Sequence, residues 1–277
     1  MPRSIWSGSI SFGLVNIPVK LVPATRDKDI HFHQLHKSDM SRIQYRTVCA
    51  AEDKEVDRQD IVKGYEVSPD QYVVLSEQEI EAAAPESSRV IDIVAFVNAD
   101  HLDALYFEHP YYLLPEQGAT KSYRLLAEAM ARENKVGIAH LVLRNHEYLA
   151  ALRVVEGAIC LHTMRFADEV ILPQKLSGLP EEVNAGEKEL AMAQQLIGAL
   201  EQEFDPRQYH SEHQQRLEQL IEKKAHGLKV TAPPPVGKPP RVINLMAALE
   251  QSLAKARKER QQQPPPSQHP HKRRRTA

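Results

Sequence analysis

The sequence predicts an α+β fold that is mainly β, in which a barrel or sandwich of antiparallel strands precedes a helical segment and a basic tail. Three observations lead to this prediction. Short apolar segments with few helical patterns between them fill the first two thirds of the 277 residues. Three of these segments, 135–145, 147–157 and 158–166, follow one another closely enough to form hairpins. Beyond Pro180 the apolar residues recur with the period of an amphipathic helix.

Composition places the chain among ordinary globular proteins, with 42% hydrophobic and 26% charged residues. No apolar run approaches the roughly 18 to 20 residues of a membrane span, and the N-terminus lacks the apolar region of a signal peptide. Cys49 and Cys160 lie far apart without a CxxC spacing, which fits a reducing compartment. We therefore expect a cytoplasmic protein without a membrane partner.

Charge is distributed unevenly along the chain. Residues 223–277 contain 13 Lys or Arg against two Glu, whereas residues 1–222 contain 22 basic and 35 acidic residues and carry a net charge of −13. The first 46 residues are an exception within this acidic part, because seven basic residues there face three Asp. An acidic body with a basic arm indicates a polyanionic partner.

The first predicted strand has an unusual polar face. In "SIWSGSISFGLVNIPVKL" (4–21), Ile10, Phe12 and Leu14 alternate with Ser9, Ser11 and Gly13. A half-buried strand normally carries longer polar side chains on its wet face. The small residues therefore indicate a close neighbour, for which another strand of the same barrel is one candidate.

The following elements are expected in chain order. Strands extend from 5 to 35, with a bulge or break at Pro18, and β-like pieces follow at 42–48 and 71–75. Ser76 and Glu79 form a capping-box pattern for a short helix that Pro85 ends. Residues 89–97 suit a strand buried on both faces, and 109–116 another strand. A helix is expected at 120–134, where Tyr123, Leu126, Ala127 and Met130 share one face.

Helical patterns dominate after residue 184. A helix at 185–204 places Leu190, Ala193, Ile197, Leu200 and Phe204 on one stripe, and a second at 211–227 ends at Gly227. A Pro-rich linker, a short helix at 242–260 and a tail that is disordered by composition follow.

No motif in the sequence predicts an active site. There is no phosphate-binding glycine loop and no nucleophile elbow. His31, His33, His36 and Cys49 offer four possible zinc ligands, but their spacing matches no structural zinc pattern, and strand histidines exposed to solvent explain them better. The aromatic residues at 106, 107, 111 and 112 fit a core better than a base-stacking platform. We predict no cofactor and no metal.

Several stretches resemble bacterial Ku. They are "RSIWSGSISFGLVNIPVKL" (3–21), "RIQYRTVC" (42–49), "DIVKGYE" (60–66), "YVVL" (72–75), "LYFEHPYYLLP" (105–115) and "ELAMAQQLIGALEQEFDPRQY" (189–209). They occur in order over residues 3–227, and the first is long and unusual. The resemblance implies a Ku-type β-barrel core with a long inserted ring-forming arm at 1–183, a helical pair at 184–227, and a linker, short helix and basic tail at 228–277.

The resemblance also implies a function. Bacterial Ku is a homodimer whose arms form a ring, and double-stranded DNA ends thread through this ring without sequence preference in non-homologous end joining. Its C-terminal part recruits a multifunctional ATP-dependent end-joining DNA ligase. The protein would then act on the bacterial nucleoid and would not be an enzyme. This function also offers DNA as the neighbour of the serine face.

Phosphate contacts are expected from cations, because a sequence-independent protein binds the sugar-phosphate rather than base edges. The candidates in the body are Arg3, Lys20, Arg26, Lys28, Arg42, Lys121 and Arg124. Those in the basic tail are Lys238, Arg241, Lys255, Arg257, Lys258, Arg260, Lys272, Arg273, Arg274 and Arg275.

Two alternatives remain open at the sequence level. Lys20 or Lys28 could form a Schiff base with an abasic DNA end and cleave it as a lyase, which requires a neutral amine. Alternatively, the tail alone could attract nucleic acid while the body has another role.

Overall fold

The computed structural model describes residues 3–83, 89–180, 186–227 and 245–262. The chain divides into two compact units, Met1–Ser177 and Gly178–Ala277, which are treated separately below. The boundary expected at residue 183 and the tail after residue 262 lie outside the described residues.

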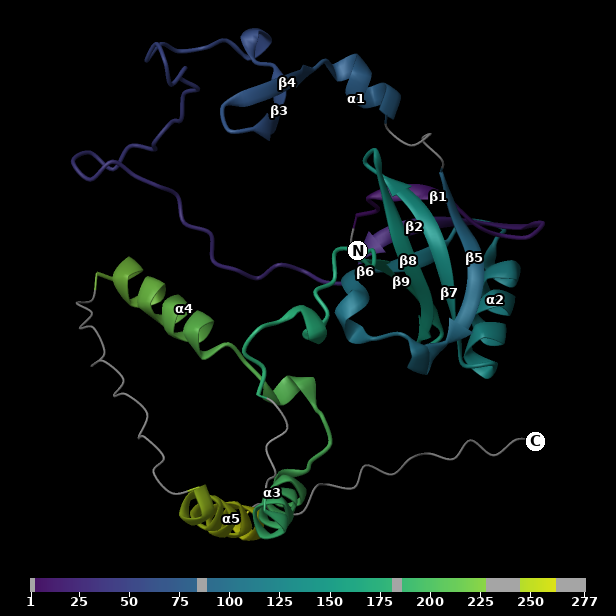
Figure 1. Ribbon diagram of the computed structural model, residues 1–277, viewed down its shortest axis with the longest axis vertical. Coiled ribbons are helices and arrows are strands. Elements are labelled where there is room, and N and C mark those ends of the chain that lie inside the picture. Colours follow the sequence, from purple (N-terminus) through teal and green to yellow (C-terminus); the bar gives the residue numbers. More distant parts are fainter. Residues whose placement is uncertain (1–2, 84–88, 181–185, 228–244, 263–277) are drawn as a thin grey trace. The chain divides into compact units, whose positions relative to one another are not determined.

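The first unit is built around a closed seven-stranded barrel, as Figure 1 shows. The order of its strands around the barrel is β1-β2-β6-β9-β8-β7-β5, and all neighbours are antiparallel except β1 and β5. A barrel, rather than a sandwich, therefore resolves the alternative left by the sequence. The strands are β1 (Trp6–Phe12), β2 (Val15–Pro23), β5 (Val90–Asn98), β6 (Phe107–Pro115), β7 (Lys135–Leu143), β8 (His146–Val155) and β9 (Ala158–Met164). Five short 3₁₀ helices occur in the described chain, at Arg58–Asp60, Ala99–His101, Ala104–Tyr106, Pro173–Lys175 and Pro206–Gln208.

Helix α2 (Thr120–Arg132) packs against the barrel with the face that the sequence predicts. Tyr123, Leu126, Ala127 and Met130 are all buried in the main core. The Tyr123 hydroxyl donates to the Leu113 carbonyl oxygen and accepts from the Ile159 N–H, both at 2.7 Å. The helix is thereby tied to β6 and β9.

The β1–β2 hairpin corrects two expectations. Leu14 does not lie on the apolar face of a strand, because Gly13 and Leu14 form the two-residue turn between Phe12 and Val15. Strand β2 also continues through Pro18 without a break or bulge. Pro18 is paired with Ser9, whose N–H donates to the Arg89 oxygen on the other side of β1. The two residues form a non-hydrogen-bonded pair, so the absent N–H of proline costs no bond to β1.

The serine face of β1 points to the outside of the barrel, since Ile10 on the opposite face is fully buried in the core. The closest backbone approach occurs one residue before Ser9, on the inward face. A Cβ atom on Gly8 would lie 2.2 Å from the Arg89 oxygen and 2.3 Å from the Trp6 ring. At Gly13 a Cβ would meet nothing, and its φ of 59° explains the glycine instead. Gly8 is thus the residue that the neighbouring backbone requires to be small.

An inserted arm connects β2 to β5. It contains β3 (Lys63–Ser68), β4 (Gln71–Leu75) and α1 (Glu77–Ala83), and β3 and β4 form a separate two-stranded sheet. The predicted capping box is confirmed, because Ser76 and Glu79 exchange side-chain and backbone hydrogen bonds.

The strands expected at 30–35 and 42–48 are wrong. Isolated bridges, Leu35 with Arg42 and Val48 with Glu55, replace them, and two tight turns interrupt the chain there. Each turn contains a residue with positive φ, Met40 or Asp53. The turns close the chain locally before a longer strand can pair.

Strand β5 is central in the barrel but is not buried on both faces. Ile91 and Ile93 point into the core, whereas Val94 is exposed. A register shift between Ile93 and Ala95 interrupts its pairing with β7. An apolar outer face in the sequence therefore does not predict burial at this strand.

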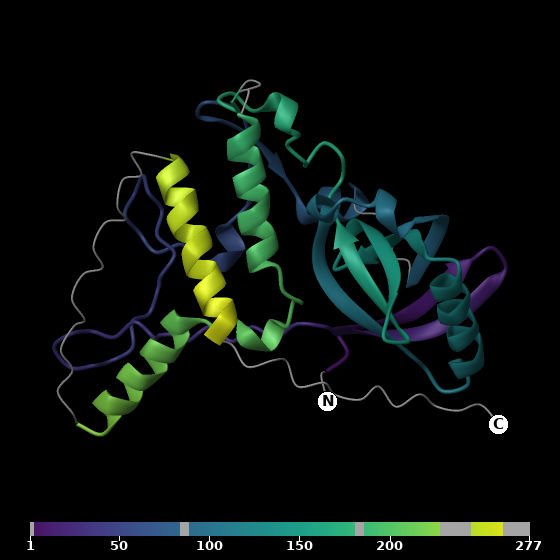
Figure 2. The same cartoon turned by 90° about the horizontal axis from the view of Figure 1, so that it is seen from below.

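The second unit contains α3 (Glu187–Leu200), α4 (Glu212–Ala225) and α5 (Leu245–Gln262). Helices α3 and α5 lie side by side in Figures 1 and 2 and are in contact. Of the predicted apolar stripe of α3, Ala193 is half-buried, whereas Leu190, Ile197 and Leu200 are exposed. The other half-buried residues of this helix are Glu189, Met192, Leu196 and Ala199. The predicted end of α4 at Gly227 is confirmed by its φ of 73°.

Candidate nucleic-acid interface

Three of the predicted cations emerge at the place where the arm leaves the barrel. Strands β1 and β2 pair with Trp6 opposite Leu21, so Arg3 lies next to the chain just after the end of β2. Arg26 and Lys28 are the third and fifth residues after Pro23, which ends β2. The side chains of Arg3, Arg26 and Lys28 are exposed. We call Arg3, Arg26 and Lys28 the arm-root cations. Their proximity follows from the strand register and could not be read from their spacing in the chain.

Lys20 lies on the outer wall of the barrel beside the serine face. It is paired with Ser7 on β1 and with Leu114 on β6. Its Nζ atom lies 3.8 Å from the Glu116 carboxylate, with about half of its side chain exposed. At this exposure the ion pair contributes little to stability, but it holds a carboxylate next to the cation.

Arg153 is an outward cation that the sequence analysis missed. Arg153 is paired with Cys160 on β9, and Cys160 is paired with Tyr112 on β6. Tyr112 is in turn paired with Val22 on β2, two residues from Lys20 and on the same face. Arg153 therefore belongs to the same outer wall as Lys20. The signal was the alternation in 146–155, where Arg153 is the single basic residue among apolar neighbours.

The remaining body candidates lie elsewhere. Arg42 is exposed in the arm, and Lys121 and Arg124 are exposed on the outer side of α2. Helix α2 covers the barrel beside the β1–β2 turn, at the end opposite to the arm root. The structure thus distributes the seven candidates over the arm root, the outer wall, the arm and α2, rather than in one cluster.

Only part of the basic tail is described. Lys255, Arg257 and Lys258 are exposed on α5, and Arg260 belongs to the same helix. Lys238, Arg241, Lys272, Arg273, Arg274 and Arg275 lie outside the described residues.

The arm exposes many large apolar side chains. Within residues 24–83 none is buried, and the β3–β4 sheet has exposed residues on both faces. A monomer rarely exposes a surface of this kind unless another molecule covers it. The 14 exposed residues are Phe32, Leu35, Met40, Ile43, Tyr45, Val48, Ile61, Val62, Tyr65, Val67, Tyr72, Val73, Val74 and Leu75.

The possible zinc ligands are engaged locally. His36 Nδ1 lies 3.1 Å from Asp39 and 3.0 Å from the Ser38 hydroxyl, and Cys49 belongs to the second turn. Hydrogen bonds from the backbone N–H groups of Ala51 and Glu52 lower the pKa of the Cys49 thiol. Among the described residues no group of three or more His, Cys, Asp or Glu side chains is placed to hold a metal ion.

Cys160, which is buried, and His162, which is half-buried, form a polar pair on the outer face of β9. The Cys160 sulfur is 3.9 Å from His162 Nδ1, and the His162 ring packs against Phe107. Burial raises the pKa of Cys160, and burial together with the nearby Arg153 charge lowers the pKa of His162. Tyr106, Phe107 and Tyr111 pack against the two apolar clusters of the barrel, as a core role predicts.

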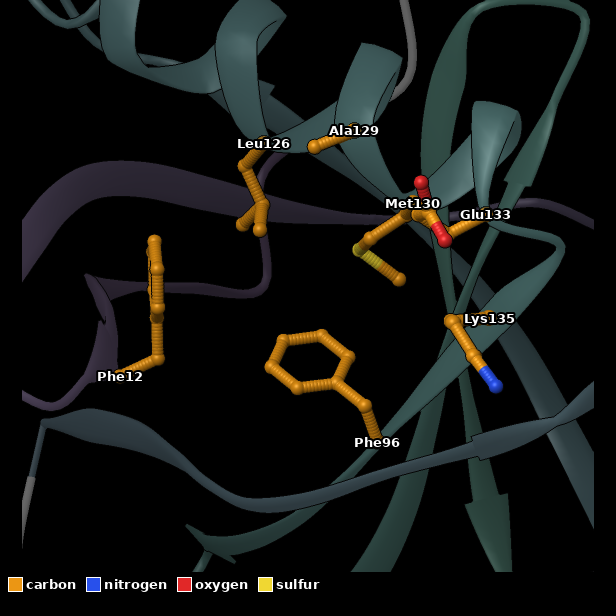
Figure 3. Close-up of a pocket in the computed structure, with 7 residues that line it drawn as sticks. All are labelled: Phe12, Phe96, Leu126, Ala129, Met130, Glu133 and Lys135. Atoms are coloured by element: carbon orange, nitrogen blue, oxygen red, sulfur yellow. The ribbon is translucent and has the colours of Figure 1, made fainter.

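An apolar cavity of about 240 Å³ opens between α2 and the barrel, and Figure 3 shows its lining. Phe12 and Phe96 form one side, with their rings edge to face at 6.4 Å. Leu126, Ala129 and Met130 of α2 form the other side, and the side chains of Glu133 and Lys135 lie at its rim. None of the helices in the described ranges is long and apolar enough to cross a membrane.

Comparison with known proteins identifies the family. Residues 11–192 match the family model described as the Ku70/Ku80 beta-barrel domain. The protein named non-homologous end joining protein Ku from Anaeromyxobacter sp. is 45% identical over 93% of this chain and 87% of its own length. The proteins of the same name from Heliobacterium modesticaldum and Bacillus subtilis are 41% and 39% identical, over 91% and 92% of this chain and 91% and 83% of their own lengths. This chain belongs to the Ku family.

Proposed function

We propose that this protein binds double-stranded DNA ends as a homodimer in non-homologous end joining, and that it recruits an ATP-dependent DNA ligase to them. The observation that carries the proposal is family membership over nearly the whole chain, with relatives whose names state the repair process. The barrel and its inserted arm are the parts that the family model covers.

The arm supports homodimerisation. A two-stranded sheet such as β3–β4 is marginally stable in water without further packing. The exposed apolar side chains of residues 24–83 require a cover, and a second copy of the same arm supplies one of matching character. Two arms that join at their ends would enclose a channel through which a DNA end passes.

Encirclement reconciles DNA binding with an acidic body. A threaded duplex dissociates only by sliding off its end, so a few phosphate contacts are sufficient. The arm-root cations and Arg42 belong to the locally basic first 46 residues and are exposed. We assign them to phosphate contacts, with Lys121 and Arg124 as weaker candidates.

The exposed stripe of α3 supports the recruitment of another protein by the second unit. Leu190, Ile197 and Leu200 remain uncovered although α5 packs on the other side of the helix. Phe204 and Tyr209, which stack with ring centroids 5.6 Å apart, are exposed just beyond it. Such a surface fits an apolar groove or helix on the ligase.

We propose a binding role rather than catalysis. A lyase would use Lys20 or Lys28 as its Schiff-base nucleophile, whereas the Lys20 Nζ atom lies 3.8 Å from the Glu116 carboxylate. Borohydride trapping on an abasic duplex tests this alternative. A trapped product that disappears in Lys20→Arg or Lys28→Arg would establish the lyase.

The deciding experiment compares a linear duplex with the same sequence as a covalently closed circle, at one stated salt concentration. Threading predicts binding to the linear duplex, added bands as its length increases, and little binding to the circle. Equal binding to the circle would contradict the proposal.

A tail variant separates threading from simple attraction to phosphate. It lacks residues 263–277 and carries Lys255→Gln, Arg257→Gln and Lys258→Gln, so that α5 remains to cover α3. Threading predicts that it still binds the linear duplex. Loss of all binding would instead assign DNA binding to the tail.

A further inference from the structure

The apolar cavity beside α2 has the size of a socket for one side chain. Its volume of about 240 Å³ is below the range typical of pockets for small organic ligands. Phe12, Phe96, Leu126 and Met130 offer apolar surface only, and Phe96 is partly exposed although it lines the cavity. An aliphatic side chain inserted between the two rings and α2 would remove this surface from water.

The side chain of matching shape is on the same end of the barrel. Leu14 is fully exposed at the tip of the β1–β2 turn, two residues from Phe12 of the socket. The knob and the socket therefore belong to one surface of the molecule. A two-fold contact between identical copies requires this arrangement, because each copy must offer both halves of the contact.

Turn geometry does not account for Leu14. Gly13 has the positive φ that the first position of a two-residue type II′ turn needs. The second position of such a turn normally holds a small polar residue such as Asn, Asp or Ser. A branched apolar residue there gains nothing from the turn and is exposed to water, which is consistent with a binding role.

The charges around the socket permit self-association. Its rim holds Glu133 and Lys135, and the adjacent surface of α2 carries the ion pair of Glu128 with Arg132. This surface is balanced in charge, whereas residues 1–222 as a whole carry −13. Two copies can approach here without the repulsion that an acidic face would impose.

We propose that two copies of this chain contact each other through this end of the barrel, with Leu14 of each copy inserted into the socket of the other. The contact is separate from the arm-mediated dimer of the proposed function and does not depend on it. A single side chain in each socket makes a small interface, so the association is weak.

Cross-linking between different copies tests the contact directly. In a Cys49→Ser background, a Leu14→Cys chain is mixed with an Ala129→Cys chain of larger tagged mass and oxidised at low micromolar concentration. Only a disulfide between copies can join these two chains. A band of the summed mass is expected, at least tenfold stronger than with a Leu105→Cys chain in place of Ala129→Cys. Equal bands from the two mixtures would overturn the proposal.

Sedimentation provides the second test. Leu14→Asp is fully exposed and Ala129→Leu fills the socket from an exposed helix position, so thermal melts verify that both variants fold. Each is expected to lose one concentration-dependent association step of the wild-type chain. A wild-type chain without such a step, or variants that retain it, would assign the socket to another partner and overturn the proposal.

Linear-duplex binding is measured alongside, and its loss in Leu14→Asp would place the tip on DNA and also overturn it. Failure of the wild type to bind DNA ends would count against the proposed function alone.

Discussion

At the scale of single residues, Gly8 leaves no room for a Cβ atom. Its Cβ position is occupied by the Arg89 carbonyl oxygen and the Trp6 ring, and the oxygen belongs to backbone that cannot rotate away. We expect Gly8→Ala to destabilise the protein by about 1–3 kcal/mol, the usual cost of overpacking. Chemical denaturation measures the loss. Gly64→Ala is the matched control, since its Cβ would make an ordinary 3.4 Å contact with Tyr72.

The Tyr123 hydroxyl is the second residue-scale feature with a measurable effect. It donates a hydrogen bond to the Leu113 carbonyl oxygen and accepts one from the Ile159 N–H inside the core. Burial raises the pKa of this hydroxyl. Tyr123→Phe leaves both backbone groups without this partner, so we expect a loss of about 1–3 kcal/mol. Tyr112→Phe on the outer wall is expected to change stability much less. Equal losses for the two variants in thermal melts would refute this assignment.

The half-buried His162 predicts a pH dependence. Burial and Arg153 lower its folded-state pKa below the ordinary value of 6.5. Between the two values the unfolded chain binds more protons than the folded one, so stability falls as pH decreases from 6.5 toward the folded pKa. We expect His162→Gln to flatten this part of the profile in denaturation at pH 7.5 and 5.5. His146→Gln at the exposed start of β8 is the control, and an unchanged slope in His162→Gln would contradict the prediction.

At the scale of elements, local patterns predicted what local interactions decide. The α2 core face, the Ser76 capping box and the three-strand meander β7–β9 are all present. The strands expected at 30–35 and 42–48 were wrong, because two tight turns close the chain there. Which side of α3 becomes covered depends on a partner outside the segment. Periodicity marked Leu190 and Ile197 as apolar, but it could not indicate that α5 contacts the neighbouring face. Likewise, only the strand register shows that Arg3 lies beside the chain that follows β2.

The α3–α5 pair provides the element-scale prediction. Leu253 is the side chain of α5 that is most completely buried among those described. Leu253→Ala is expected to cost about 2 kcal/mol, at the low end of the range for buried leucines. The helical signal at 222 nm should then be lost at a lower temperature, while Ser252→Ala on the exposed side leaves it unchanged. If both variants melt as the wild type does, α5 does not stabilise α3.

At the scale of the whole molecule, the distribution of charge decides how a protein of net charge −2 binds a polyanion. The body repels phosphate overall, so binding must come from a few exposed cations at defined places. The paired cations Arg132, Arg207 and Arg216 are already neutralised by Glu128, Asp205 and Glu212. The arm-root cations belong to the locally basic first 46 residues. Net charge is therefore a poor guide to DNA affinity in this chain.

Salt dependence measures this distribution. Each phosphate contact releases counterions and contributes about 0.9 to the slope of log affinity against log salt concentration for duplex DNA. We expect the triple variant Arg3→Gln, Arg26→Gln and Lys28→Gln to lower the slope for a short linear duplex by about 2–3. The matched triple Arg132→Gln, Arg207→Gln and Arg216→Gln removes the same formal charge from paired positions and should leave the slope close to that of the wild type. If both triples lower it equally, the effect comes from net charge, and the arm root makes no specific phosphate contact.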